Sequence, residues 1–126
     1  MIVELPFPPS VNAMFFNVPG RGRVKTTDYK AWELEAGLML RRQKPTIFSE
    51  RVEISVDLDE TRRGDADNRF KAVADLLVKH GVIPDDSKRY VKRVSIGWES
   101  GVSGCRVQIK PVDDTCANSP NPTLPA

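Results

Sequence analysis

Two closely spaced carboxylates are the clearest chemical signal in the sequence. Residues 62–68 read RRGDADN, so Asp65 and Asp67 stand two positions apart behind a glycine. If the backbone between them is extended, their side chains point to the same side and the two carboxylates converge. Converging like charges are costly to ionise unless a cation lies between them. Because hard divalent ions prefer carboxylate oxygens, the spacing suits a metal site.

A simpler interpretation of the same residues needs no metal. In it, Asp67 caps the helix that follows and Asp65 closes an Asx turn. A calcium loop of the EF-hand type is excluded, because its fifth and sixth positions, counted from Asp65, are Arg69 and Phe70. A zinc site of the usual ligand types is excluded as well, because His80 is the only histidine and the two cysteines form no CxxC pair.

Lys71 and Asp75 follow Asp67 at intervals of four residues, which places all three on one face of a helix. Lys71 can then reach back toward the carboxylate pair, where the helix N-terminus favours anions. Beside a scissile phosphate, such a lysine would supply positive charge. Otherwise these residues are surface pairs, worth about a few tenths of a kcal/mol each.

A second acidic pair, Asp85 and Asp86, follows the same helix. A helix of about twelve residues is roughly 18 Å long, so the loop after it starts far from Asp65. For Asp86 to join the site, the segment GVIPDD must return along the sheet, beside a strand that packs next to its predecessor. The alternative is an ordinary acidic turn.

Hydrophobic periodicity predicts the elements that hold these residues. Residues 51–59 alternate as a half-buried strand, and residues 68–80 follow a helical period that Gly81 closes. A helix over 29–43 is predicted after a cap at Thr27 or Asp28, with Trp32, Ala36, Met39 and Leu40 on its inner face. Further strands are expected at 1–7, in a hairpin over 11–26, and at 90–100 and 105–112, joined near SGVSG. The order predicts a single α/β (α+β) domain with one mixed sheet and two main helices.

Composition and charge describe an ordinary globular protein with basic clusters. Hydrophobic residues make up 40% and charged residues 29% of the chain, and no apolar run approaches the roughly 20 residues of a membrane helix. With no secretion signal, we expect a cytoplasmic protein without membrane contact. Residues 113–126 carry two acids, no base and three prolines, which predicts a disordered tail after a domain at 1–112. The domain then has 19 basic against 15 acidic residues, and a polyanion suits its clustered bases.

Four segments resemble a known family, in the same order and at comparable spacing. They are LPFPPSVN, GRGRVKT, RRGDADNRFKAVADLL and KHGVIPDDSKR. On these segments residues 1–112 resemble the RusA-type Holliday junction resolvases, metal-dependent endonucleases of phages and prophages that act in DNA recombination and repair. The D-x-D-N-x-x-K core with a later D-D pair is the specific part of the match. The catalytic positions show no departure from the family pattern.

The resemblance implies a site and a cofactor. The catalytic and metal-binding carboxylates would be Asp65, Asp67 and Asp86, and the active-site lysine would be Lys71. Mg²⁺ is the implied ion, with Mn²⁺ as a substitute, and the products would be nicks with 5′-phosphate and 3′-hydroxyl ends. Residues at matching positions with a supporting role would be Asn68, Asp75 and Asp85.

The resemblance also implies a C2 homodimer on branched DNA, since a four-way junction must be cut in two strands. The residues expected to contact DNA are Arg21, Arg23, Lys25, Asn12, Arg62, Arg63, Lys88 and Arg89. In an alternative interpretation, Asn12 stabilises its own loop. Phe15 and Phe16 either insert as a wedge into the opened crossover or lie in the core or the dimer interface. Two other functions stay open, a nuclease for branched DNA in general and a junction-binding protein without catalysis.

Overall fold

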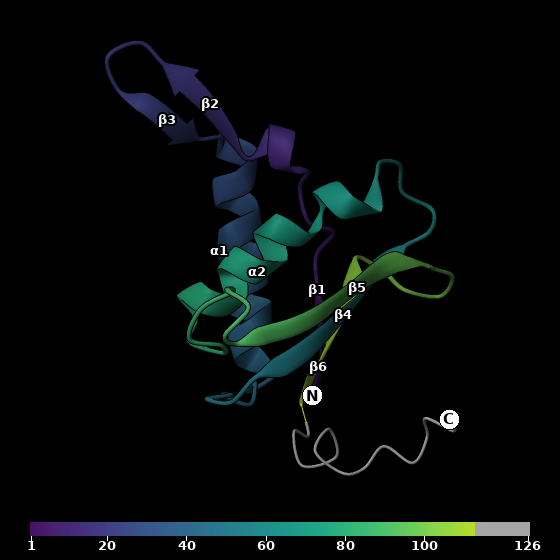
Figure 1. The fold of residues 1–126 in the computed structure, drawn as a ribbon. Coiled ribbons are helices and arrows are strands. Elements are labelled where there is room, and N and C mark those ends of the chain that lie inside the picture. Colours follow the sequence, from purple (N-terminus) through teal and green to yellow (C-terminus); the bar gives the residue numbers. More distant parts are fainter. Residues whose placement is uncertain (113–126) are drawn as a thin grey trace, which may run out of the picture.

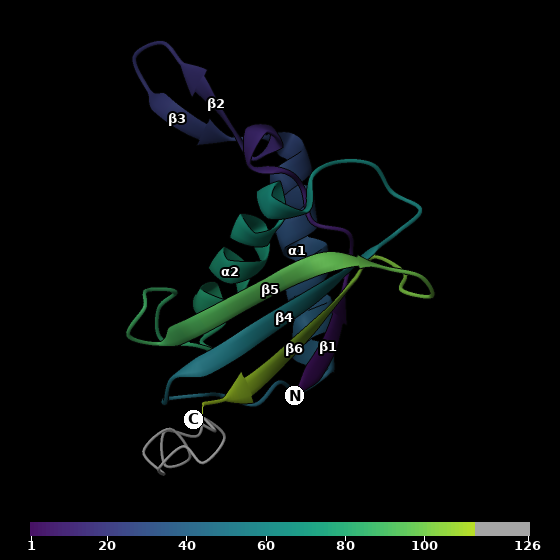
Figure 2. The ribbon, with the colours of Figure 1, turned by 45° about the vertical axis from the view of Figure 1, so that its right-hand side comes forward.

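The alternating segment predicted at 51–59 is the inner strand on which the sheet is built. In the computed structural model, which describes residues 1–112, β4 (Val52–Asp59) buries every second residue. β5 (Val91–Glu99) pairs with β4 in parallel, and β6 (Cys105–Pro111) pairs with its other edge in antiparallel fashion. β1 (Ile2–Leu5) joins β6, which gives the order β1-β6-β4-β5 (Figures 1 and 2). The prediction of one mixed sheet is confirmed, beside a separate two-stranded hairpin.

The turn near SGVSG joins two strands that are not neighbours. β5 and β6 lie on opposite sides of β4, so the chain crosses the end of β4 between them. Gly101 and Gly104 have φ angles of +80° and +75° in this turn, a conformation that other residues rarely adopt. A hairpin between β5 and β6 is therefore absent from this sheet, because both strands use β4 as their partner.

Two helices cover one face of the sheet (Figures 1 and 2). α1 (Thr27–Arg42) begins after Thr26, whose hydroxyl accepts a hydrogen bond from the amide of Tyr29, so the predicted cap is wrong by at least one position. α2 (Phe70–Lys79) starts two residues later than predicted, because Ala66–Asn68 form a separate 3-10 turn, η2. Gly81 ends α2 with a φ of +73°, as the sequence predicts.

The hydrophobic core lies between these helices and the sheet. Of the predicted inner face of α1, Trp32, Ala36 and Leu40 are buried, whereas Met39 is only half-buried. The core residues of the sheet come from alternate positions, and the opposite face of the sheet carries polar and charged side chains. The largest fully buried side chains include Tyr29, Leu5, Met14, Leu40, Ile54, Leu58, Leu76, Leu77, Ile83 and Ile109.

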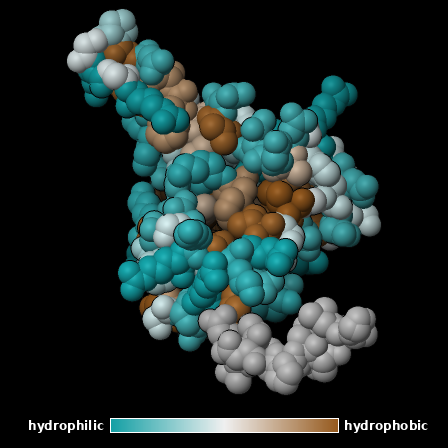
Figure 3. Space-filling model, viewed as in Figure 1, coloured by the Kyte–Doolittle hydropathy of each residue, from teal (hydrophilic) through white to brown (hydrophobic). Residues whose placement is uncertain are grey.

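The predicted basic hairpin is confirmed and stands apart from the sheet. It follows a short turn, η1 (Val11–Ala13), and consists of β2 (Phe15–Val18) and β3 (Gly22–Lys25). In Figure 1 it projects from the end of the molecule where α1 begins, and Figure 3 shows hydrophilic residues along it. The hairpin therefore presents its side chains beyond the body of the domain.

No helix within residues 1–112 combines the length and the apolar character needed to cross a bilayer. The predicted tail, 113–126, lies outside the described residues.

Candidate functional site

The loop between β4 and α2 carries the two closely spaced carboxylates. Asp65 has extended backbone angles (φ −102°, ψ 132°) at the start of η2, yet its side chain makes no capping hydrogen bond. Asp67 lies within η2, and α2 begins after Arg69 without a side-chain cap. The interpretation in which Asp67 caps the helix is therefore wrong. Both carboxylates are exposed and available to a ligand.

Arg69 and the N-terminal segment hold this loop in place. The guanidinium of Arg69 donates hydrogen bonds to the carbonyl oxygens of Pro8 (3.0 Å) and Arg63 (3.2 Å). It also lies over the ring of Phe7, 4.9 Å from the ring centre, while Arg62 covers the same ring at 4.6 Å. These contacts tie the acidic loop to the proline-rich segment more than fifty residues earlier in the chain.

Gly64 makes the position of Arg69 possible. Its φ of +127° is accessible essentially only to glycine, and a Cβ at this position would overlap Nη2 of Arg69. Asp65 follows directly, so the direction in which its carboxylate leaves the loop depends on this glycine.

Lys71 connects two carboxylates from different parts of the chain. Its Nζ lies 3.0 Å from Oδ1 of Asp75 and 3.9 Å from Oδ2 of Asp86. The expectation that Lys71 reaches back toward Asp65 and Asp67 is not met, because Asp75 leans toward the helix N-terminus and meets Lys71 one turn earlier. The hydrogen bond from Lys71 to Asp75 raises the pKa of the lysine, and burial opposes this. Lys71 is thus a fixed positive charge between two acids.

Asp86 reaches Lys71 because the segment after α2 folds back. Val82 and Ile83 are buried in the core, which turns the chain toward the sheet directly after Gly81. The carbonyl of Val82 accepts a hydrogen bond from the amide of Phe48 (2.8 Å). The return of the GVIPDD segment, which the sequence left open, is therefore found, and burial of two apolar side chains drives it.

A surface cleft of about 380 Å³ lies beside these acids. Its walls come from the base of the hairpin, from α1, from α2 and from the loop after α2, and the lining residues are Phe15, Lys25, Tyr29, Glu33, Asp75, Val78, Lys79, Asp85 and Asp86. Burial, and after it the charge of Glu33, raises the pKa of Tyr29 far above its ordinary value, so its hydroxyl stays neutral. The cleft therefore combines aromatic walls with acids and lysines.

The chemistry of the predicted donors fits Mg²⁺. Asp65, Asp67 and Asp86 offer hard oxygen atoms on exposed loops, which is the ligand type this ion prefers. Among residues 1–112, no three histidine, cysteine, aspartate or glutamate side chains lie close enough together to enclose a metal ion. Acidic side chains repel one another without a cation between them. The sharing of one ion by these three aspartates stays a prediction.

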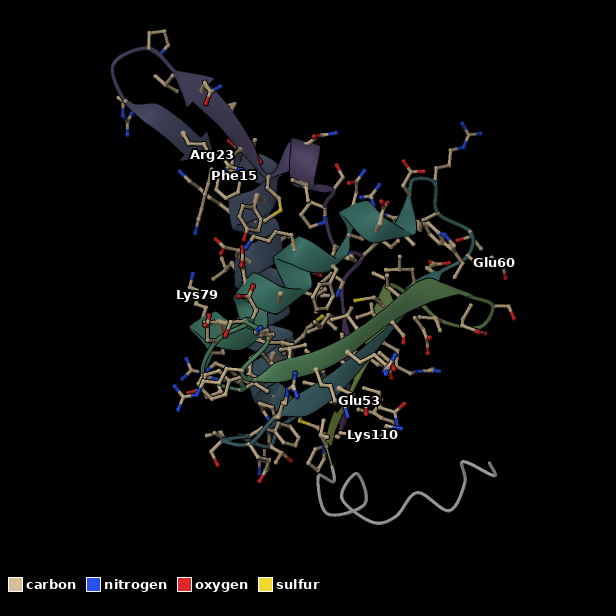
Figure 4. The ribbon with its side chains drawn as sticks, in the orientation of Figure 1. Phe15, Arg23, Glu53, Glu60, Lys79 and Lys110 are labelled. Carbon is tan, nitrogen blue, oxygen red and sulfur yellow. The ribbon has the colours of Figure 1, made fainter. Side chains whose placement is uncertain are left out.

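The predicted DNA-binding residues lie at several places. Arg21, Arg23 and Lys25 belong to the hairpin, and Arg23 lies over the ring of Phe15, 4.2 Å from its centre (Figure 4). Asn12 and Phe16 line a small hollow next to Arg23, and Phe16 is half-exposed. The other candidates are exposed residues near the acidic loop and after α2, namely Arg62, Arg63, Lys88 and Arg89. Asn68, predicted to have a supporting role in the site, is half-buried in η2.

Sequence reasoning missed the residues that support the site. Gly64 was read only as part of the acidic motif, although a glycine directly before a functional acid is a usable signal. Arg69 and Glu33 carried no signal, because their partners lie far away in the chain. Only the folded chain identifies them.

Known proteins match this chain over most of the described domain. Residues 6–110 match the family described as Endodeoxyribonuclease RusA. A relative from Enterobacteria phage HK97, the crossover junction endodeoxyribonuclease RusA, is 29% identical over 109 residues. The match covers 84% of this chain and 88% of that protein.

Proposed function

This chain belongs to the endodeoxyribonuclease RusA family, and from this premise we propose that it resolves Holliday junctions by paired, symmetric nicks that depend on Mg²⁺. The observation that carries the proposal is the approach of Asp86 to Lys71, 3.9 Å apart although most of α2 and the loop after it separate them in the chain. Both residues lie inside the family match, as do Asp65 and Asp67. We further propose that the protein acts in the cytoplasm, in DNA recombination and repair.

The role proposed for each site residue follows from the chemistry of its side chain. Asp65, Asp67 and Asp86 hold the ion, and Lys71 places positive charge beside the phosphate where negative charge develops. Bound Mg²⁺ would supply Lewis-acid stabilisation of that charge and a water of lowered pKa. Asp86 completes the ligand set or accepts the proton of the attacking water, and Asp75 orients Lys71 through its 3.0 Å contact.

Two cuts at one junction require two sites, so we propose that the active form is a C2 homodimer. The projecting hairpins and the basic clusters would follow the DNA arms through phosphate contacts. Sedimentation velocity tests the assembly directly. In addition, mixed dimers with one Asp67→Asn subunit should give single nicks in place of paired ones.

The decisive experiment uses a synthetic immobile four-way junction, incubated with the purified protein with and without Mg²⁺. Symmetric nicks that appear only with the ion support the proposal. Comparison with a replication fork, a flap and linear duplex separates a resolvase from a general branched-DNA nuclease. Binding without nicking in either Mg²⁺ or Mn²⁺ would leave the non-catalytic junction-binding protein as the function.

An Asp67→Asn protein tests the catalytic assignment. It should bind the junction as tightly as the wild type, while nicking falls by about a hundredfold or more, the size of effect typical for loss of one charge at a transition state. Asp57→Asn is the matched control, since Asp57 lies on the helix-free face of β4 and should leave nicking unchanged. Equal nicking by both variants would refute the role of Asp67.

A further inference from the structure

Glu33 joins three elements of the fold at one point. From α1, it accepts hydrogen bonds from Nζ of Lys25, at the end of the hairpin, over 3.0 and 3.2 Å. Its second oxygen also lies 3.8 Å from Nζ of Lys79, on α2. The Glu33 side chain is only 10% exposed, whereas those of the two lysines are 41% and 56% exposed. A largely enclosed carboxylate with two cations is a stronger connection than an ordinary surface pair.

Around this connection, aromatic contacts support the base of the hairpin. Phe15 meets Tyr29 edge-on, with 5.6 Å between ring centres, and Lys25 lies over the ring of Tyr29 at 5.5 Å. The hairpin pairs with no other strand among residues 1–112, and its remaining residues extend beyond the body of the domain (Figure 1). Its direction is therefore set at its base, where Glu33 provides the charged contact.

The same base faces the acids of the candidate site. Phe15, Lys25 and Glu33 line one cleft together with Asp85 and Asp86. A change in the angle of the hairpin would thus move Arg21 and Arg23 relative to those carboxylates.

We infer that Glu33 is a positioning residue, which holds the basic hairpin at a fixed angle to the acidic site so that one DNA arm can contact both. The inference rests on the proposed function for its DNA readout. It requires no contact between Glu33 and the DNA, because Glu33 acts through Lys25 and Lys79.

The test compares Glu33→Gln with Glu35→Gln, an exposed glutamate two positions away on the same helix. Amide hydrogen exchange of residues 15–25 reports the hairpin, and exchange of β4 reports global stability. In Glu33→Gln we expect hairpin exchange to rise about tenfold, the loss expected for one charge-assisted hydrogen bond, with β4 unchanged. Glu35→Gln should match the wild type at both places.

Junction binding without metal supplies the second readout. The Kd of Glu33→Gln should rise by the factor by which the correctly oriented population of the hairpin falls, at most about tenfold, because only that population is competent to bind. Where wild-type cleavage is measurable, KM should rise while kcat stays unchanged.

Equal hairpin exchange in both variants would overturn the inference, and so would a freed hairpin with unchanged junction affinity. If β4 exchange also rises, Lys25→Gln replaces Glu33→Gln, since it removes the hairpin's contact with Glu33 but keeps the contact of Glu33 with Lys79. Hairpin exchange must then rise above the wild type or the inference fails. Absence of nicking in the wild type would refute the proposed nuclease alone, because exchange and binding still decide the role of Glu33.

Discussion

Replacement of Gly64 by alanine tests how the acidic loop is held. The backbone of Gly64 has a φ of +127°, and a Cβ there would overlap Nη2 of Arg69. Arg69 must then move, and it cannot move without loosening its hydrogen bonds to Pro8 and Arg63. We therefore expect both a less stable protein and a displaced Asp65.

The size of the effect follows from these contacts. A non-glycine residue in this region of φ costs about 1–3 kcal/mol. Weakening of the two Arg69 hydrogen bonds adds about 1 kcal/mol, since each contributes roughly 0.5–1.5 kcal/mol and part of each can re-form. The free energy of unfolding should accordingly fall by about 2–4 kcal/mol.

Urea denaturation measures this loss, with Gly101→Ala as the matched control. Gly101 also has a positive φ, +80°, but a Cβ there would meet no atom within 4 Å. The control therefore reports backbone strain alone and should cost about 1–2 kcal/mol. The difference between the two variants reports the contact with Arg69 together with the extra backbone strain at a φ of +127°.

Nicking of a four-way junction completes the assay. Gly64→Ala should nick more slowly than Gly101→Ala under conditions in which both are fully folded, because only the first change displaces Asp65. If the two variants lose equal stability and nick at equal rates, Arg69 does not hold the acidic loop and the reasoning is refuted.

Two titration predictions concern other parts of the fold. His80, the single histidine of the chain, should have a pKa below 6.5. Burial is the main cause that lowers this pKa, and the positive charges of Arg41 and Lys79 lower it further. NMR of the imidazole protons measures the pKa, and a value at or above 6.5 would contradict the prediction. Since the unfolded chain then binds the proton more readily, the free energy of unfolding should fall as the pH drops below 6.5, and less so in His80→Gln. Burial raises the pKa of Cys105 to about 12, so in a Cys116→Ser protein this thiol should resist alkylation at about pH 8 until urea unfolds the chain. Rapid labelling of the native protein would show that Cys105 is accessible.

Local patterns in the sequence determined most of the elements and the type of chemistry. The alternation at 51–59 and the helical period from Phe70 onward depend on which face of an element is buried, and this is visible within a few residues. The hairpin follows in the same way from its Pro-Gly turn. Residue types also limited the metal chemistry to oxygen ligands, because the chain has one histidine and no paired cysteines.

The tertiary structure decided which distant residues meet. Burial of Val82 and Ile83 brings Asp86 back to Lys71, and the contacts of Arg69 with Phe7 and Pro8 tie the acidic loop to the N-terminal segment. The tertiary structure likewise sets the position of β6 between β1 and β4 and the contacts of Glu33 with two lysines. Such contacts depend on how the whole core packs, and this packing cannot be predicted from any short stretch of neighbouring residues.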